Sequence, residues 1–227
     1  MKKAVCLLSG GIDSTTTAAI AKAEGWEILA LTVDYGQRHR REIKAAGRVA
    51  SALKIAEHIH LELDLRAWGG SALTSENIAV PVGQELGSCP RRIPITYVPA
   101  RNMILLSLAV SYAEAKQAQR VYFGANSRDY SGYPDCRPEF VQAFTKAATL
   151  GTRTGVEGRP IEILAPLQKL TKAEIIRRGI ELGVDYSLTW SCYERKEEAC
   201  GKCDSCRIRL AAFAELGMED PISYENK

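Results

Sequence analysis

The chain has 227 residues, 46% of them hydrophobic, and a net charge of +3. It can therefore bury a full core, which excludes a disordered or fibrous protein, and its apolar runs are far shorter than the ~20 residues of a membrane span. The apolar run after Lys2 and Lys3 lacks a signal-peptide cleavage site, and the charge is too small to mark a dedicated nucleic-acid binder. We expect a cytoplasmic protein without a membrane partner, and the charge permits nucleic acid as a partner but does not imply it.

The first half of the chain alternates apolar runs with segments of helical spacing. The pattern predicts β-α-β-α-β, with strands and helices in turn over residues 4–8, 14–23, 27–33, 41–53 and 55–63. Glycine and proline interrupt any period over residues 64–99. We predict an irregular excursion over the active face there.

The second half resumes the alternation. Helix, strand, helix and strand are predicted in turn over residues 102–118, 120–124, 138–150 and 161–164. Thr171 and Glu174 form a capping-box pattern that opens a further helix, which ends near Gly183. The whole order predicts an α/β fold, a parallel twisted sheet with helices on both faces and ligands at the carboxyl ends of its strands.

A glycine-rich loop joins the first strand to the first helix, with the sequence Ser9-Gly10-Gly11-Ile12-Asp13-Ser14-Thr15. Backbone N–H groups and a helix N-terminus converge there on an anion, and the hydroxyl groups add donors. The Gly-x-x-x-x-Gly-Lys-Ser/Thr and Gly-x-Gly-x-x-Gly patterns are both missing. A plain strand-to-helix turn needs fewer glycines than this loop has. The segment resembles the PP-loop, whose pattern is Ser-Gly-Gly-x-Asp-Ser.

This resemblance implies an ATP pyrophosphatase with a Rossmann-like fold of the adenine nucleotide alpha hydrolase type. In that class the loop holds the β,γ-pyrophosphate of ATP, with Mg²⁺, and cleavage between the α and β phosphates leaves AMP on the substrate. The implied ATP-binding residues are Leu8, Ser9, Gly10, Gly11, Ile12, Asp13, Ser14, Thr15, Thr16, Thr17 and Ala18. Asp13 and Ser14 are also implied as catalytic residues.

Four cysteines near the end of the sequence, Cys192, Cys200, Cys203 and Cys206, form the pattern Cys-x7-Cys-x2-Cys-x2-Cys. Four thiolates suit tetrahedral Zn²⁺ and leave no open position for substrate, so we predict one structural zinc per chain. An iron-sulfur cluster is the alternative, although the proline and spacing of the ferredoxin pattern are missing; disulfides and inert buried cysteines are the others. We expect residues 186–227 to form a small zinc-binding segment packed on a PP-loop domain of residues 1–185, where the metal holds the segment near the active site.

Three further motifs lie at predicted strand ends or helix starts. They are Tyr35-Gly36-Gln37-Arg38-His39, Val98-Pro99-Ala100-Arg101-Asn102 and Asp129-Tyr130-Ser131-Gly132-Tyr133-Pro134-Asp135-Cys136-Arg137. With the cysteine pattern they resemble the 7-cyano-7-deazaguanine synthase family of queuosine precursor biosynthesis, from Ser9 to Cys206. The resemblance implies that 7-carboxy-7-deazaguanine, ATP and ammonia give an amide and then a nitrile, with AMP and diphosphate released, and it implies a homodimer.

The individual side chains leave alternatives open. Candidate substrate-binding residues are Gln37, Asp129, Tyr133 and Asp135, where the two carboxylates either accept hydrogen bonds from the base or cap the helix near Pro138, and the tyrosine either stacks or packs. Candidate phosphate or carboxylate clamps are Arg38, Arg101 and Lys169, each of which is otherwise a solvated charge. His58 and His60, on a strand, are interpreted as structural.

Two other functions remain in competition. One is a PP-loop enzyme that modifies tRNA, such as a thiolating enzyme or a lysidine-forming ligase, although a stronger basic stripe is expected for RNA. The other is a zinc-ribbon binding protein whose nucleotide loop regulates affinity, which the conversion of ATP to AMP would exclude. Because no further domain is expected to release ammonia from glutamine, we expect free ammonium as the nitrogen donor.

Overall fold

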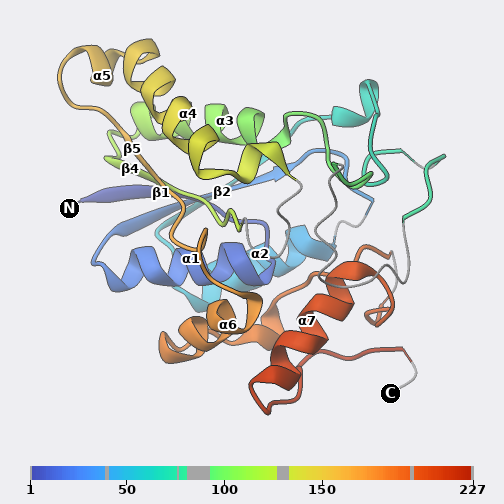
Figure 1. The fold of residues 1–227 in the computed structure, drawn as a ribbon. Helices are drawn as coiled ribbons and strands as arrows, with labels where there is room; N and C mark the ends of the chain where they lie inside the picture. Colours follow the sequence, from blue (N-terminus) through green and yellow to red (C-terminus); the bar gives the residue numbers. More distant parts are fainter. Residues whose placement is uncertain are drawn as a thin grey trace.

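The computed structural model describes residues 2–38, 41–75, 77–80, 93–126, 133–194 and 197–225. Its centre is a parallel five-stranded sheet in the order β3-β2-β1-β4-β5 (Figure 1). The strands are β1 (Lys3–Leu7), β2 (Glu27–Asp34), β3 (Glu57–Glu62), β4 (Arg120–Tyr122) and β5 (Glu162–Leu164). Strands β2 and β3 are added on one side of β1, and β4 and β5 on the other. This change of direction in the strand order opens a crevice at the carboxyl ends of β1 and β4.

Helices cover both faces of the sheet (Figure 1). One face carries α1 (Ile12–Ala23) and α2 (Arg41–Ala52), and the other carries α3 (Arg101–Ala115), α4 (Pro138–Gly151) and the short α5 (Arg153–Val156). Successive residues of β1 serve the two faces: Cys6 packs in the cluster of α1 and α2, and Val5 in that of α3 and α4. The prediction of a parallel sheet with helices on both faces is confirmed.

A further layer packs on the outer side of α1. It consists of α6 (Lys172–Glu181) and α7 (Asp204–Glu215), which share an apolar cluster with α1. Ile175 and Ile176 of α6 are fully buried there, and burial of each side chain contributes about 1.5–3 kcal/mol. The hydroxyl of Tyr186 lies 2.7 Å from Oγ1 of Thr16 in α1, so this layer is also tied to the helix that follows the glycine-rich loop.

The predicted elements agree closely with the observed ones. Thr171 and Glu174 form a capping box in which both hydrogen bonds are present. The described part of residues 64–99 contains a single short 3₁₀ helix, Leu65–Ala67, which confirms the irregular excursion. The sequence did not predict α5, α7 or the two other short 3₁₀ helices, Pro134–Cys136 and Tyr186–Leu188.

A buried ion pair fixes α7 to the residues after it. The guanidinium of Arg209 donates to both carboxylate oxygens of Asp220, at 2.6 and 2.9 Å, and it also donates to the hydroxyl of Thr189 at 2.8 Å. Arg209 is 1% exposed, so this charge is stabilised only because it is paired and hydrogen-bonded. Of the helices that the structure describes, none has the length and apolar character to cross a membrane.

Candidate active site

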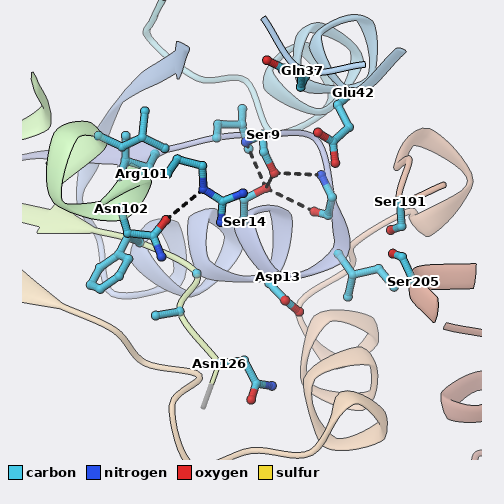
Figure 2. A pocket seen from close by; sticks show the side chains of 18 of the residues that line it. Ser9, Asp13, Ser14, Gln37, Glu42, Arg101, Asn102, Asn126, Ser191 and Ser205 are labelled. Atoms are coloured by element: carbon cyan, nitrogen blue, oxygen red, sulfur yellow. Dashed lines mark hydrogen bonds between the residues drawn. The ribbon is translucent and has the colours of Figure 1, made fainter. Parts of the chain in front are cut away.

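A cavity of about 300 Å³ opens at the carboxyl ends of β1, β2 and β4. Its walls come from the glycine-rich loop, the start of α3, the residues after β4 and the C-terminal segment (Figure 2). The predicted site residues that line it are Leu8, Ser9, Gly11, Ile12, Asp13, Ser14, Gln37, Arg101 and Tyr133. Segments distant in the sequence thus meet where a parallel sheet places its ligands.

The glycine-rich loop has a backbone that only glycine tolerates. Gly10 has a φ of +86°, and a Cβ atom there would lie 2.4 Å from the amide nitrogen of Ala46 and from the carbonyl oxygen of Glu42. The loop therefore presses directly against α2. Gly124, after β4, approaches the loop from the other side, because a Cβ atom there would lie 2.9 Å from the amide nitrogen of Ser14.

The hydroxyl-bearing residues of the loop differ in their access to the cavity. Ser9 and Ser14 face the cavity, with their Oγ atoms 3.0 Å apart, and the Oγ of Ser14 accepts a hydrogen bond from the Ser9 amide at 3.1 Å (Figure 2). The hydroxyl of Ser14 also donates to the Gly11 carbonyl oxygen at 3.2 Å, and those of Thr15 and Thr16 likewise donate to carbonyl oxygens one turn earlier. Of the predicted ATP-binding residues, Gly10, Thr15, Thr16, Thr17 and Ala18 do not line the cavity.

Asp13 forms an ion pair with a lysine that the sequence motifs did not indicate. The Nζ atom of Lys172 lies 2.6 and 2.7 Å from the two carboxylate oxygens of Asp13. Lys172 is the first residue of α6, and both side chains line the cavity. The pair places a carboxylate, a group that binds metal ions, and an ammonium group, a group that binds phosphate, together at one end of the cavity.

Arg101 and Asn102 begin α3 and face the cavity from the opposite side (Figure 2). The helix is entered through Ala100, whose φ of +52° lies in the left-handed region, a strained conformation that is common at functional sites. The guanidinium of Arg101 lies over the ring of Tyr35, 5.7 Å from its centroid, and donates to its hydroxyl at 3.3 Å. The arginine is therefore held at the cavity wall.

Asp135 caps this same helix. Its carboxylate accepts a hydrogen bond from the Asn102 amide at 2.9 Å, and the side chain is 5% exposed. Burial raises the pKa of Asp135 above its usual range. The sequence left a base contact or a cap near Pro138 as alternatives, but the structure shows a cap on α3, and Asp135 is not among the cavity-lining residues.

Tyr133 and Gln37 both line the cavity, but each has a polar atom bound by the protein. The hydroxyl of Tyr133 lies 2.7 Å from Oγ1 of Thr96, and burial raises its pKa. Gln37 accepts a hydrogen bond from the Tyr35 amide at 2.9 Å.

Cys136 also lines the cavity. Burial raises the pKa of its thiol to about 12, so the side chain stays a neutral thiol at physiological pH.

Two of the predicted clamps are not brought to the cavity. The guanidinium of Arg38 donates to the carbonyl oxygens of Ser75 and Ile78, and so holds the excursion after β3. Lys169 is exposed and does not line the cavity. Asp129 lies outside the described residues, as does His39.

The four cysteines come together as the sequence predicts. Their sulfur atoms all lie within 4.8 Å of one another, and all four side chains are buried. Backbone amides donate to these sulfurs, among them the Cys200 amide to Cys192 at 3.3 Å and the Cys203 amide to Cys200 at 3.3 Å. Hydrogen bonds from the neighbouring thiols of Cys192 and Cys206 lower the pKa of Cys203. Four converging sulfurs with amide donors fit a tetrahedral zinc site.

The same C-terminal segment supplies one wall of the cavity, and the sequence did not predict which of its residues line it. Residues next to two of the cysteines line it, namely Ser191, Tyr193 and Ser205, together with Ile208 and Arg209 of α7. The Trp190 amide donates to the carbonyl oxygen of Gly10 at 2.9 Å, so this segment is bonded directly to the glycine-rich loop. The serines next to Cys192 and Cys206 were the signal in the sequence that could have indicated these lining residues.

Comparisons with known proteins identify relatives of this chain. The chain is 57% identical over 222 residues, 98% of its length and 97% of the relative's, to a 7-cyano-7-deazaguanine synthase from Nostoc sp. strain PCC 7120. It is 55% identical, over 99% of both chains, to one from Saccharophagus degradans. The structure of an NMN synthetase from Francisella tularensis is similar in fold, with 16% identity, a TM-score of 0.50 and coverage of 96% of this chain and 78% of that chain.

The family relationship extends over nearly the whole chain. Residues 3–217 match the model of the family described as queuosine biosynthesis protein QueC. Because this match covers far more than half of the sequence and the curated relatives are more than half identical, the chain belongs to the QueC family of queuosine biosynthesis proteins.

Proposed function

We propose that this chain converts 7-carboxy-7-deazaguanine and ammonia to 7-cyano-7-deazaguanine, with ATP as the activating agent and AMP and diphosphate as products. The observation that carries the proposal is the Asp13–Lys172 pair beside the hydroxyls of Ser9 and Ser14, at the N-terminus of α1 and open to the cavity. The names of the curated relatives supply the product, 7-cyano-7-deazaguanine.

Adenylation answers a specific chemical difficulty. A carboxylate is a poor electrophile, because its charge opposes attack and its oxygen is a poor leaving group. Transfer of AMP to that oxygen removes both obstacles, and ammonia then displaces AMP to form an amide. A second adenylation, on the amide oxygen, allows AMP and protons to leave, so that carbon and nitrogen become triply bonded. The chemistry needs positioning and charge stabilisation rather than a nucleophilic side chain, in keeping with the neutral thiol of Cys136.

The loop end of the cavity would hold the phosphates. Backbone N–H groups at the start of α1 and the hydroxyls of Ser9 and Ser14 are the donors for the leaving pyrophosphate. Lys172 supplies positive charge beside them, and the carboxylate oxygens of Asp13 are the type of ligand that Mg²⁺ prefers. Mg²⁺ bound with ATP would neutralise part of the charge on the phosphates.

The opposite end of the cavity suits the deazaguanine. Its wall is apolar and aromatic, with Tyr35, Leu105, Phe123 and Tyr133, and Arg101 provides a cation for a carboxylate or a phosphoryl oxygen. A planar base would stack favourably on these aromatic rings, and the cation would pair with an anionic group of the ligand. Gln37 is retained in the proposal as a substrate contact because it lines this cavity.

The proposal also includes the tail and the assembly. Cys192, Cys200, Cys203 and Cys206 would hold one zinc ion, which fixes residues 186–227 against the PP-loop domain of residues 1–185. Ammonium is the nitrogen donor, and the chain acts as a homodimer, as the family resemblance implies. Sedimentation velocity distinguishes a dimer from a monomer of 24.9 kDa.

Mass spectrometry of the reaction products tests the proposed function. Purified protein is incubated with 7-carboxy-7-deazaguanine, ATP, Mg²⁺ and ammonium, with glutamine replacing ammonium in a parallel sample. We expect the nitrile, AMP and diphosphate with ammonium, and no nitrile with glutamine alone. Formation of ADP and phosphate, or an unchanged acid, would overturn the proposal.

A further inference from the structure

The hydroxyls of Ser191 and Ser205 lie in the cavity without an evident role in the fold. Both residues line it and both are only partly buried. Within the described ranges, no hydrogen bond to either hydroxyl is found. Figure 2 shows both hydroxyls on the C-terminal segment, on the far side of the pocket from Arg101 and Asn102. They are therefore two donors that face the space where a ligand would bind, with no hydrogen-bond partner among the residues that the structure describes.

Their position identifies the part of the ligand that they meet. The Trp190 amide donates to the carbonyl oxygen of Gly10 at 2.9 Å, and Ser191 is the next residue. Consecutive Cα atoms are about 3.8 Å apart, so Ser191 lies beside the glycine-rich loop. The loop serves the phosphates in the proposed function, and a hydroxyl next to it is a donor for phosphate oxygens.

Both serines are adjacent in sequence to cysteines of the four-cysteine cluster. Ser191 precedes Cys192 and Ser205 precedes Cys206, and the sulfur atoms of these cysteines are within 4.8 Å of each other. Ser205 also lies in the first turn of α7, which the buried Arg209–Asp220 pair fixes in place. The two hydroxyls are therefore attached to a common rigid support.

The segment that carries the four cysteines also contacts α2, the helix that packs against the glycine-rich loop. The guanidinium of Arg41 in α2 lies over the ring of Trp190, 4.6 Å from its centroid, and Arg48 donates to the Leu188 carbonyl at 3.1 Å. The Ala45 side chain packs in the same cluster as Trp190 and the four cysteines. Because α2 also touches Gly10, the loop and the cysteine centre share one contact surface.

We infer that Ser191 and Ser205 are contacts for the pyrophosphate part of ATP, held in position by the four-cysteine centre. The centre thereby completes the phosphate site with two hydroxyls from outside the glycine-rich loop. This inference rests on the proposed use of ATP. It assigns to the C-terminal segment a direct part in nucleotide binding as well as a structural one.

The test compares two nucleotides that differ in the β and γ phosphates. Isothermal titration calorimetry with Mg²⁺ measures the dissociation constants of α,β-methylene-ATP and of AMP, for the unsubstituted chain and for Ser191→Ala and Ser205→Ala. Ser187→Ala is the matched control, since Ser187 is an exposed serine of the same segment and does not line the cavity. Zinc content and thermal unfolding are measured on every sample.

Each cavity variant should bind the ATP analogue about ten- to a hundredfold more weakly, the effect of one hydrogen bond to a charged group, while AMP affinity stays within about twofold. Zinc content and unfolding temperature should stay unchanged, and Ser187→Ala should match the unsubstituted chain. Unchanged analogue affinity in both variants, an equal loss for AMP, or loss of zinc would overturn the inference. Failure of the unsubstituted chain to bind the analogue would overturn the proposed function instead.

Discussion

The ammonium group of Lys172 contacts both carboxylate oxygens of Asp13, at 2.6 and 2.7 Å, although 159 positions separate the two residues. The contact joins the first turn of α6 to the first turn of α1, and it places a cation and an anion together at one end of the cavity. Both charges are partly accessible to a ligand, with side-chain exposures of 16% and 29%.

Removal of either charge should slow catalysis without unfolding the protein. We predict that Lys172→Met and Asp13→Asn each lower kcat about 10²–10³-fold, because a preorganised electrostatic contact to the reacting phosphates is lost. AMP formation followed by chromatography measures the rate, and circular dichroism checks the fold. Lys146→Met, an exposed lysine of α4, is the control and should keep the original rate. Rates within about threefold of the original in both site variants would contradict the assignment.

The cysteine centre should contain zinc. Elemental analysis is expected to find about one zinc per chain, and Cys203→Ser should lose the metal and lower the unfolding temperature, because a structural zinc site contributes directly to folding. Cys6→Ala is the control, since Cys6 is buried in the sheet far from the cluster in the sequence, and it should keep the metal. Iron with visible absorbance, or four freely titrating thiols without metal, would exclude a zinc centre.

Gly10 should tolerate no side chain. Gly10→Ala adds a Cβ atom 2.4 Å from backbone atoms of α2, in addition to the strain of a positive φ. We expect a loss of about 2–5 kcal/mol in the free energy of unfolding. Gly25→Ala is the matched control, with a φ of +83° and no atom within 4 Å, and it should cost only about 1–2 kcal/mol. Equal losses in urea denaturation would show that α2 does not press on the loop.

His58 should make stability depend on pH. Burial, with a smaller effect of His60, lowers its pKa to about 4, while the unfolded chain titrates near ~6.5. Between these values the unfolded state binds more protons, so the free energy of unfolding should fall as pH decreases from 6.5 to 4. His58→Gln can keep the hydrogen bond to Thr32 and cannot titrate, so this variant should show a shallower fall. Metal loss in acid affects both proteins, so the difference between their denaturation curves isolates His58.

Much of the fold can be predicted because β1 and β2 are short apolar runs bounded by turns. Residues 28–33 of β2 are buried throughout, as expected for a strand covered on both faces. The capping box at Thr171 is equally local, since both of its hydrogen bonds join residues three positions apart. In contrast, the sequence of α7 does not show the apolar spacing of an amphipathic helix, because one of its buried positions is Arg209. The buried charge of Arg209 is neutralised by Asp220.

The site is less predictable because long-range contacts determine which side chains enter it. In the sequence, Lys172 is simply the first residue of a capped helix, and nothing near it indicates a role in the site. Only the fold brings its side chain to Asp13. Arg38 adjoins a cavity residue in the sequence, yet its guanidinium binds carbonyl oxygens of the excursion after β3. Asp135 caps a helix that begins more than 30 positions earlier. No local pattern contains these pairings.

The stoichiometry of the reaction tests the central claim most directly. Purified protein with Mg²⁺, ATP and ammonium is given either 7-carboxy-7-deazaguanine or the synthetic amide, and AMP and nitrile are quantified together by mass spectrometry. The account predicts two AMP for each nitrile formed from the acid and one for each nitrile formed from the amide. If the acid is converted to amide while added amide remains unchanged, the protein is an amide-forming ligase and the claim of nitrile synthesis is contradicted.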